Sequence, residues 1–295
     1  MNQLLNFSKR VSEVDIATKY IFPAGDELVY VDNGSGKDIF CIPSQSGCKL
    51  GCKFCFLTSR SDQEVRQMKA PQALEMINTA FQDLNLTTGN KTLLISFMGM
   101  GEPLLSPGYI FEVSKMVVDE YKDRYDQVRF GLATIVPSVR LLNDLAQIVE
   151  QPTKVHWSLH NPFDHERSLV MPNASSIESS AKALADYREK TGNPIEIHYT
   201  VFDGNDGLDH ADELAKIALA YNFPVKFLKF SERPDPELIT SKVTDLFIHR
   251  VSNHGVTTET YAPPGHDIQG ACGEFEHNFK KTIHTKASDV CESNL

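Results

Sequence analysis

The sequence of 295 residues lacks several features that would assign it to a familiar class of protein. No apolar run reaches the ~18 residues that a membrane span needs, and the N-terminus holds no apolar signal core. Internal repeats, low-complexity tracts and long linkers are also missing. These absences favour a cytoplasmic globular protein, and a chain of this length suits one large α/β domain.

Positive charge is scarce as well. The chain has 29 lysines and arginines against 39 aspartates and glutamates, which gives a net charge of −10. Proteins that bind nucleic acid usually carry a basic patch. Lysines beside apolar residues, as in "FPVKFLKF", could form a local basic face, but scattered solvated lysines are the simpler explanation. Charge alone therefore neither identifies nor excludes such a partner.

Cysteine is rare but unevenly distributed. Only six are present, and four of them fall within "CIPSQSGCKLGCKFC", which runs from Cys41 to Cys55. In a reducing compartment, clustered cysteines more often hold metal or perform chemistry than form structural disulfides. Cys48, Cys52 and Cys55 are spaced C-x3-C-x2-C. A structural zinc site normally takes four protein ligands, so three thiolates on one short loop leave a metal open on one side.

Short strand-like runs alternate with amphipathic helix-like segments along most of the chain. The expected pairs are 38–44 with 71–84, 92–99 with 109–121, 128–134 with 138–150, 154–160 with 176–190, 195–203 with 208–222, and 225–232 with 240–253. Such alternation predicts a parallel sheet covered by helices. No glycine-rich dinucleotide turn follows the first strand, which favours a complete or partial barrel over a doubly wound nucleotide fold.

A barrel places its chemistry at the C-terminal ends of the strands. The cysteine loop follows the first predicted strand, the glycine-rich "GMGEP" follows the second, and Ser158 and His160 end the fourth. Glycines there suggest a backbone that comes close to a ligand. We expect residues 1–36 to form a short N-terminal extension, 37–255 the core, and 256–295 a C-terminal tail packed on the barrel.

The cysteine spacing, with Phe54 before the third cysteine, resembles the radical S-adenosylmethionine (SAM) superfamily. The match narrows to the RlmN/Cfr family through four motifs: "CIPSQSGC" (41–48), "FMGMGEPLL" (97–105), "SLHNPFDHER" (158–167) and "DIQGACGEF" (267–275). The resemblance runs from about 27 to 275. It implies a partial (β/α)6 TIM-type barrel and methylation of an adenosine base in RNA, at C2 or, second in preference, at C8.

The resemblance also implies roles for the cysteines. Cys48, Cys52 and Cys55 would hold a [4Fe–4S] cluster whose open iron binds SAM. Cys272 would accept a methyl group from one SAM, and a second SAM, cleaved at the cluster, would turn that group into a methylene radical that adds to adenine. Cys41 would then resolve the covalent link and leave a Cys41–Cys272 disulfide, which requires Cα atoms ~5.5 Å apart.

Further roles follow from the same resemblance. The expected SAM contacts are Gly101, Glu102, Pro103, Ser158, Leu159, His160 and Glu232. Glu27 is expected near the reacting base, as a hydrogen-bond acceptor or an aid to proton removal. Two simpler interpretations stay open: a His160 satisfied by backbone, and a Glu27 that is only a solvated strand-edge charge. The family chemistry also calls for an external electron donor such as flavodoxin, and we expect a monomer; Cys291 matches no motif.

The sequence departs from the family around the substrate. Only 40 residues precede Cys41, where the family carries a helical RNA-binding domain, and "TETYAPPGHD" replaces its arginine-rich approach to the tail cysteine. Glu232 replaces an asparagine and Ala133 a serine.

We therefore expect a small exposed target, in tRNA or a ribosomal RNA fragment, held through few phosphate contacts that include Lys226 and Lys229. One alternative keeps the chemistry but acts on another nucleotide or a small molecule. Another is a metal-binding module that is not an enzyme, which would need neither Cys41 nor Cys272.

Overall fold

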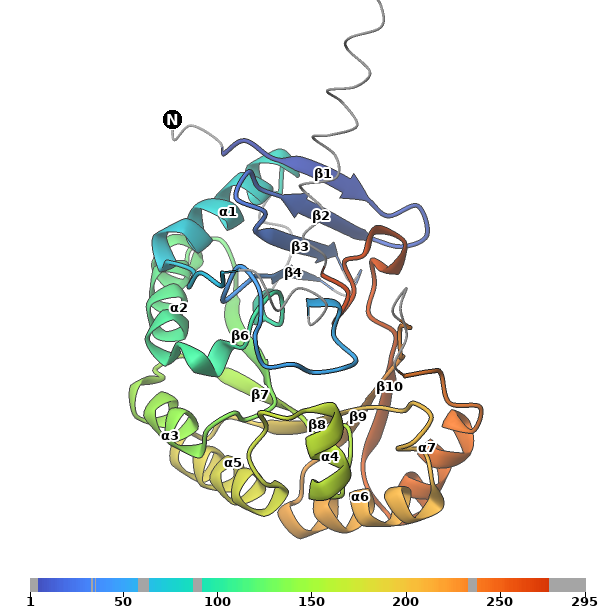
Figure 1. Cartoon of the computed structure of the whole chain (residues 1–295). Coiled ribbons are helices and arrows are strands. Elements are labelled where there is room, and N and C mark those ends of the chain that lie inside the picture. The colour runs from blue at the N-terminus through green and yellow to red at the C-terminus, as the bar shows by residue number, and fades with distance from the viewer. Residues whose placement is uncertain are drawn as a thin grey trace, which may run out of the picture.

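The computed structural model describes residues 5–32, 34, 36–57, 64–86, 92–232 and 238–275. Ten strands in these ranges form one sheet whose spatial order follows the chain from β1 to β10. Figure 1 shows the sheet curved around a central space with the helices outside it. In the part of the chain described, no helix is long and apolar enough to cross a membrane. The sixth cysteine of the chain, Cys291, lies outside these ranges.

The six predicted β–α units are confirmed. Their parallel strands are β4 (Lys37–Cys41), β5 (Thr92–Phe97), β6 (Gln127–Thr134), β7 (Thr153–Ser158), β8 (Ile195–Thr200) and β9 (Val225–Leu228). Their helices are α1 (Ala70–Asp83), α2 (Pro107–Tyr121), α3 (Val139–Ile148), α5 (Ile177–Thr191), α6 (Leu208–Tyr221) and α7 (Thr244–Asn253). Proline starts α1 and α2, and left-handed Gly192 and Asn222 end α5 and α6, as helix-capping preferences predict. The result is a partial barrel.

Four strands were not predicted as such. At one edge β1 (Ser8–Val11), β2 (Ala17–Ile21) and β3 (Glu27–Asp32) extend the sheet through antiparallel pairs, and β3 pairs antiparallel with β4. At the other edge β10 (Thr258–Tyr261) pairs parallel with β9. Short helical segments α4 (Asp164–Val170), η2 (Pro103–Leu105) and η3 (His266–Ile268) complete the described elements.

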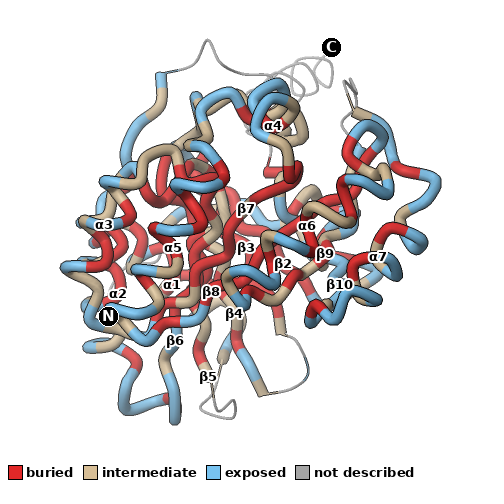
Figure 2. Tube along the Cα trace, turned by 90° about the horizontal axis from the view of Figure 1, so that it is seen from below, coloured by how far each residue is buried: buried red, intermediate tan, exposed pale blue. Residues whose placement is uncertain are grey.

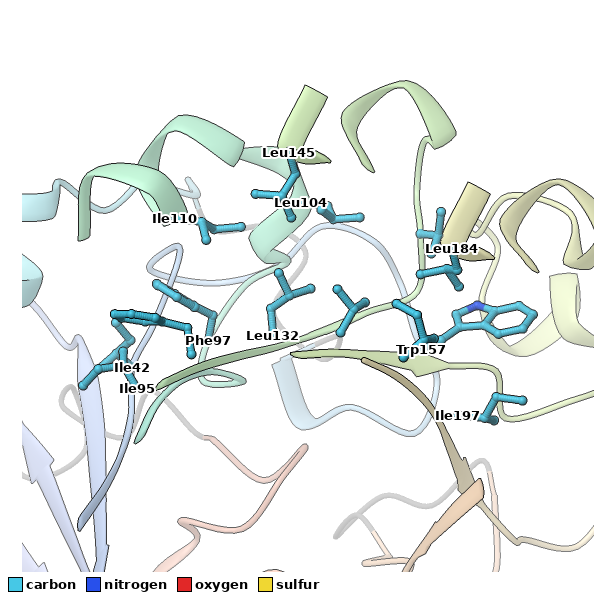
Figure 3. Close-up of a cluster of buried hydrophobic side chains, with 14 of the residues drawn as sticks. Ile42, Ile95, Phe97, Leu104, Ile110, Leu132, Leu145, Trp157, Leu184 and Ile197 are labelled. Atoms are coloured by element: carbon cyan, nitrogen blue, oxygen red, sulfur yellow. The ribbon is translucent and has the colours of Figure 1, made fainter. Parts of the chain in front are cut away.

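The core lies between the sheet and the outer helices. Figure 3 shows strand side chains Ile95, Phe97, Leu132, Trp157 and Ile197 facing helical side chains Leu104, Ile110, Leu145 and Leu184. All are at most 1% exposed, and burial of each large apolar side chain favours folding by about 1.5–3 kcal/mol. In Figure 2 the buried residues run through the strands while the outer helix faces are exposed. This packing fixes the strand ends that carry the polar residues discussed below.

The segment after β10 returns across the first three strands, as Figure 1 shows beside β2 and β3. The Ser12 hydroxyl donates to the Asp267 carboxylate at 2.8 Å, and the Gly265 amide donates to Asp15 at 2.7 Å. Beneath these contacts, Ile268 and Phe275 join a small apolar cluster with residues of β2 and β3. The return of the chain places Cys272 at the mouth of the barrel.

Candidate functional site

The main cavity opens at the C-terminal ends of the parallel strands, where a barrel was expected to carry its chemistry. Its wall is built from the cysteine loop, the turns after β5 to β9 and the tail. The lining falls in the segments 48–57, 97–102, 133–135, 158–160, 198–200, 228–231 and 272–275, together with Pro263. Four of the quoted sequence motifs therefore contribute to one wall.

The cysteine loop brings three thiols to this wall. Burial raises the pKa of Cys48 to about 12, and neighbouring Cys55 adds to the rise. Burial, with Cys55 and Cys48 beside it, likewise raises the pKa of Cys52. The three sulfurs therefore interact with one another, and a bound cation would favour the thiolate forms that metal ligation needs.

The turn after β5 presents Glu102. Its carboxylate accepts hydrogen bonds from the Leu104 amide at 3.1 Å and the Ile135 amide at 3.2 Å. Burial raises the pKa of Glu102 to about 7, although hydrogen bonds from Thr134 and these amides oppose the rise. The group can therefore exist in either protonation state near neutral pH.

The glycines beside Glu102 pack closely against another part of the protein. A Cβ at Gly99 would lie 2.7 Å from the Ile42 carbonyl oxygen, and one at Gly101, where φ is +100°, would lie 2.7 Å from the Cβ of Gln45. This close approach is to the segment after β4, and both glycines also line the cavity. The same packing holds Glu102 in place, because the Gln45 side chain accepts from its amide at 3.0 Å.

His160 follows β7 with a positive φ of 52°. Its Nδ1 accepts a hydrogen bond from the Thr200 amide at 3.0 Å. Burial, with His198 and Arg167 nearby, lowers the pKa of His160 to about 3. The ring is therefore neutral, with its proton on Nε2, and it lines the cavity beside the edge of Phe54. The backbone satisfies one nitrogen, as the simpler interpretation held, and leaves the other as a donor.

Arg167 was not singled out from the sequence, although it ends the quoted motif "SLHNPFDHER". Its guanidinium is buried and donates to the Leu159 carbonyl at 3.0 Å, the Ile135 carbonyl at 3.1 Å and the Ser175 carbonyl at 2.6 Å. Carbonyl groups at the ends of two strands are thereby joined through one side chain. Arg167 fixes the part of the rim that presents Ser158 and His160.

Four expected contacts do not lie in the cavity wall that the described residues form. Leu159 is fully buried in the core, and its amide and carbonyl are bonded to His198 and Arg167. Pro103 is buried at the start of η2. Glu232 accepts from the Thr240 amide at 2.7 Å beside an outer cleft. Glu27 is buried with its carboxylate 2.7 Å from the Lys19 ammonium, so it is neither a solvated edge charge nor a group that faces the cavity.

Cys41 and Cys272 come together although 231 positions separate them in the sequence (272 − 41). Both are free thiols; Cys41 ends β4 and is half-buried, and Cys272 lines the cavity. Burial raises the pKa of Cys41, and the neighbouring Cys272 raises it further. Burial and Glu274 raise the pKa of Cys272 to about 11. The tail thus brings the second thiol into the electrostatic neighbourhood of the first.

Two side chains next to this pair were missed. The pKa of Tyr261 rises to about 12 through burial and through Cys272 and Cys41, so its phenol shares their surroundings. Glu274 is 1% exposed, lines the cavity and is hydrogen-bonded through one oxygen to His266. The sequence offered no signal for either residue, because their positions depend on how the tail folds back.

A second polar cluster lies inside the barrel below the cavity. Glu196 is bonded to His156 Nδ1 at 3.0 Å, and the Lys154 and Lys226 ammonium groups lie 2.9 and 3.4 Å from its carboxylate. With His198 these residues form what we call the floor cluster. Among the described residues, His156, Glu196 and His198 are the one trio with ligand atoms within 4.8 Å. The Lys154 and Lys226 ammonium groups compensate the charge of the Glu196 carboxylate.

The floor cluster corrects one expectation. Lys226 was expected to contact phosphate, but its ammonium lies between Glu196 and Glu259, 3.3 Å from the latter, and its side chain is 17% exposed. Lys229 is exposed and lines the cavity mouth. Only the second lysine is therefore placed to meet an incoming phosphate.

Comparisons with known proteins agree with this geometry. No family model matches the chain. It is 30% identical over 299 residues to a probable dual-specificity RNA methyltransferase RlmN of Finegoldia magna, covering 94% of this chain and 80% of that protein. It is also 30% identical to a ribosomal RNA large subunit methyltransferase Cfr of Lachnoclostridium phytofermentans, covering 88% of this chain and 77% of the relative.

Solved structures share the fold. A radical SAM methyltransferase from Sphaerobacter thermophilus superimposes with a TM-score of 0.78 at 22% identity, covering 92% of this chain and 81% of that one. Methylornithine synthase superimposes with a TM-score of 0.50 at 14% identity, over 74% of this chain and 63% of the other. At these identities the likeness concerns the fold alone.

Proposed function

Because the chain belongs to the RlmN/Cfr family of radical SAM RNA methyltransferases, we propose that it methylates an adenosine base in RNA, using Cys272 to carry the methyl group. The observation that carries this proposal is that the tail brings the Cys272 thiol into the electrostatic surroundings of Cys41, in a cavity that the three-cysteine loop also lines. An RNA methyltransferase that transfers directly from SAM would need no such pair. We favour C2 of the base over C8.

The cysteine loop has the donor set that an iron–sulfur cluster requires. Cys48, Cys52 and Cys55 supply three soft thiolates on one side of the cavity, which supports a [4Fe–4S] cluster. When bound, the cluster supplies the electron that cleaves SAM and starts the radical chemistry. Arg167 favours the Cys52 thiolate and so assists ligation.

We assign SAM binding to the rim. Glu102 would accept hydrogen bonds from the amino group of SAM, while Gly101 holds the turn that presents this carboxylate. Ser158 and the neutral Nε2–H of His160 supply hydrogen-bond donors for the ribose or the methionine part. A neutral imidazole suits this role because it adds no repulsion toward the sulfonium charge.

The two remaining cysteines divide the methyl transfer between them. Cys272, exposed to the cavity, takes up a methyl group at its sulfur and presents it to the base. The Cys41 thiolate then attacks the Cys272 sulfur, so that a disulfide forms as the sulfur–carbon bond to the base breaks. The bonding pair stays on the carbon, and a proton completes the methyl group on the base. Two SAM molecules are used in each turnover, and the disulfide is reduced before the next. An external donor such as flavodoxin would supply electrons to this cytoplasmic monomer.

The substrate proposal follows from the charge at the mouth. Lys229 is available there, whereas Lys226 is neutralised by Glu196 and Glu259. Few phosphate contacts imply a shallow dependence of affinity on salt, and they suit a small exposed loop of tRNA or of ribosomal RNA with the target adenosine turned out. The same scarcity of charge favours, as a second candidate, a different nucleotide or small-molecule acceptor.

Analysis of nucleosides tests the proposal. Total RNA from cells with and without the gene is digested and searched by mass spectrometry for methyladenosine isomers. We expect one isomer, 2-methyladenosine, to disappear with the gene and to be restored by the unsubstituted protein but not by Cys272→Ala. Unchanged RNA alongside active SAM cleavage by the purified protein would favour the second candidate.

A further inference from the structure

One buried lysine contacts the tail on both sides of Cys272. The Lys19 ammonium, on β2, donates a hydrogen bond to the Gln269 carbonyl at 2.8 Å. The same ammonium lies 5.7 Å from the centre of the Phe275 ring, a distance at which a cation is attracted to an aromatic face. Gln269 precedes Cys272 by three positions and Phe275 follows it by three. Lys19 therefore contacts both ends of segment 269–275.

The position of Lys19 is itself fixed by a neighbouring strand. Its side chain is 1% exposed and lies 2.7 Å from the Glu27 carboxylate, which is fully buried on β3. A buried ammonium is costly to remove from water unless an opposite charge and hydrogen bonds replace the solvent. Because β2 and β3 are adjacent in the sheet, Glu27 holds the ammonium at one place relative to the barrel.

Other contacts pin the segment between these ends. Gln269 has a left-handed φ of 56°, and its side chain accepts from Arg10 at 3.3 Å. The carbonyl of Gly273, directly after Cys272, accepts from the Phe56 amide at 2.9 Å, on the cysteine loop. A non-glycine residue in the left-handed region is unfavourable, and contacts on both the side chain and the carbonyl of Gln269 offset that cost.

We propose that Lys19 is a positioning residue for Cys272. Lys19 holds both ends of segment 269–275 so that the Cys272 sulfur meets Cys41. The catalytic meaning of this meeting rests on the proposed function, whereas the positional claim concerns only the two thiols. Glu27 acts in this arrangement as the counter-ion of Lys19. The resolving step between the cysteines would then depend on a side chain that contacts neither sulfur.

Disulfide formation between the two thiols provides a direct test. Cluster-loaded protein is treated without oxygen with diamide, which takes two electrons and two protons from Cys41 and Cys272 as their sulfur–sulfur bond forms. Remaining thiols are blocked at intervals, and mass spectrometry of peptides measures the linked fraction. Lys19→Met alone would leave Glu27 buried without its partner, so the main variant is Lys19→Met with Glu27→Gln.

We expect the double variant to form the disulfide at least ten-fold more slowly than the unsubstituted protein, with partial recovery in Lys19→Arg. Phe275→Leu, which keeps the ion pair and removes only the ring, should slow the reaction by a smaller factor. The matched control is Lys9→Met, which removes another lysine of the N-terminal strands, one that pairs with Asp83 of α1 at 2.6 Å. This control should react at the unsubstituted rate.

Two outcomes would overturn the proposal: an unchanged rate in a folded double variant, or, should that variant not fold, an unchanged rate in Phe275→Leu. Melting temperature and iron content, measured in every variant, identify which case applies. A failure of the proposed function would look different, because the unsubstituted protein would then form the disulfide with diamide but would not methylate RNA.

Discussion

The rim and the floor of the barrel both hold histidine and glutamate side chains, but the surroundings of these side chains differ. At the rim, Glu102 and His160 are fixed by backbone groups and still line the cavity. On the floor, Glu196 and His156 are bonded to each other, and two lysines neutralise the carboxylate. The comparison teaches that similar side chains serve different ends: those that line the cavity can meet a ligand, whereas those whose charges compensate each other stabilise the fold.

The largest expected effect concerns the rim. Replacing any of Cys48, Cys52 or Cys55 by Ala should abolish both iron binding and SAM cleavage, because a three-thiolate site cannot lose a ligand and keep its cluster. Iron analysis after anaerobic reconstitution and detection of 5′-deoxyadenosine with dithionite check this. Cys291→Ala is the control and should retain both properties. A triple variant that still bound a cluster and cleaved SAM would refute the assignment.

The next prediction separates rim from floor by stability. Glu196→Gln should destabilise the fold by about 3–5 kcal/mol, because Lys154 and Lys226 lose the charge that compensates them. Glu102→Gln should destabilise the fold less, by about 1–3 kcal/mol, because its side-chain nitrogen can no longer accept from one of the Leu104 and Ile135 amides. It should nevertheless lower SAM cleavage by at least ten-fold. Denaturant unfolding and SAM-cleavage assays measure the two effects. The reverse pattern would break the distinction between the regions.

Lowering the pH should destabilise the fold in part through the floor cluster. Burial, with His198 nearby, lowers the pKa of His156 to about 3, so the unfolded chain takes up this proton near pH 6.5 and the folded one does not. Stability from this group is therefore complete above pH 6.5 and falls as the pH drops toward 3, by about 2 kcal/mol at pH 5. Denaturant unfolding at pH 7.5 and pH 5 checks it. His156→Gln should remove this share of the difference, whereas His160, whose pKa burial also lowers to about 3, keeps its own share. Equal stability at the two values would contradict it.

The smallest expected effect concerns the pKa of the Cys272 thiol at the rim. The negative charge of Glu274 contributes to the raised pKa of Cys272, after burial. Glu274→Gln should therefore lower that pKa. Iodoacetamide reacts with the thiolate, so the pH profile of Cys272 alkylation should move to lower pH, with Glu213→Gln on exposed α6 as a control. A shift to higher pH would show that Glu274 assists deprotonation of the thiol.

Sequence patterns predicted the regular half of the fold and failed at its edges for physical reasons. The six β–α units bury strongly apolar faces, which give clear periodicities. In β2 and β3 the buried Lys19 and Glu27 interrupt the apolar pattern, and their pairing becomes visible only once the strands are adjacent. Strand β10, "TETY", has no buried residue at all and so offers no apolar signal.

The candidate site likewise has residues that local patterns predict and residues that they miss. Local spacing predicted the cysteine loop, and the two-residue period along an extended strand accounts for Ser158 and His160 at the cavity with Leu159 in the core. Contacts between distant segments were beyond such patterns. Tertiary packing places Glu274 of the tail near Cys272. It also places Lys226 against Glu196 in the floor cluster.

The most direct test of the central claim is the intact mass of the Cys41→Ala protein after reaction with SAM and RNA. If Cys272 carries the methyl group and Cys41 resolves the link to the base, this variant should accumulate a covalent adduct. After nuclease digestion the added mass should equal a nucleotide plus one methylene carbon, located at Cys272. A variant that turns over without any adduct, or one whose adduct lies on another residue, would contradict the account.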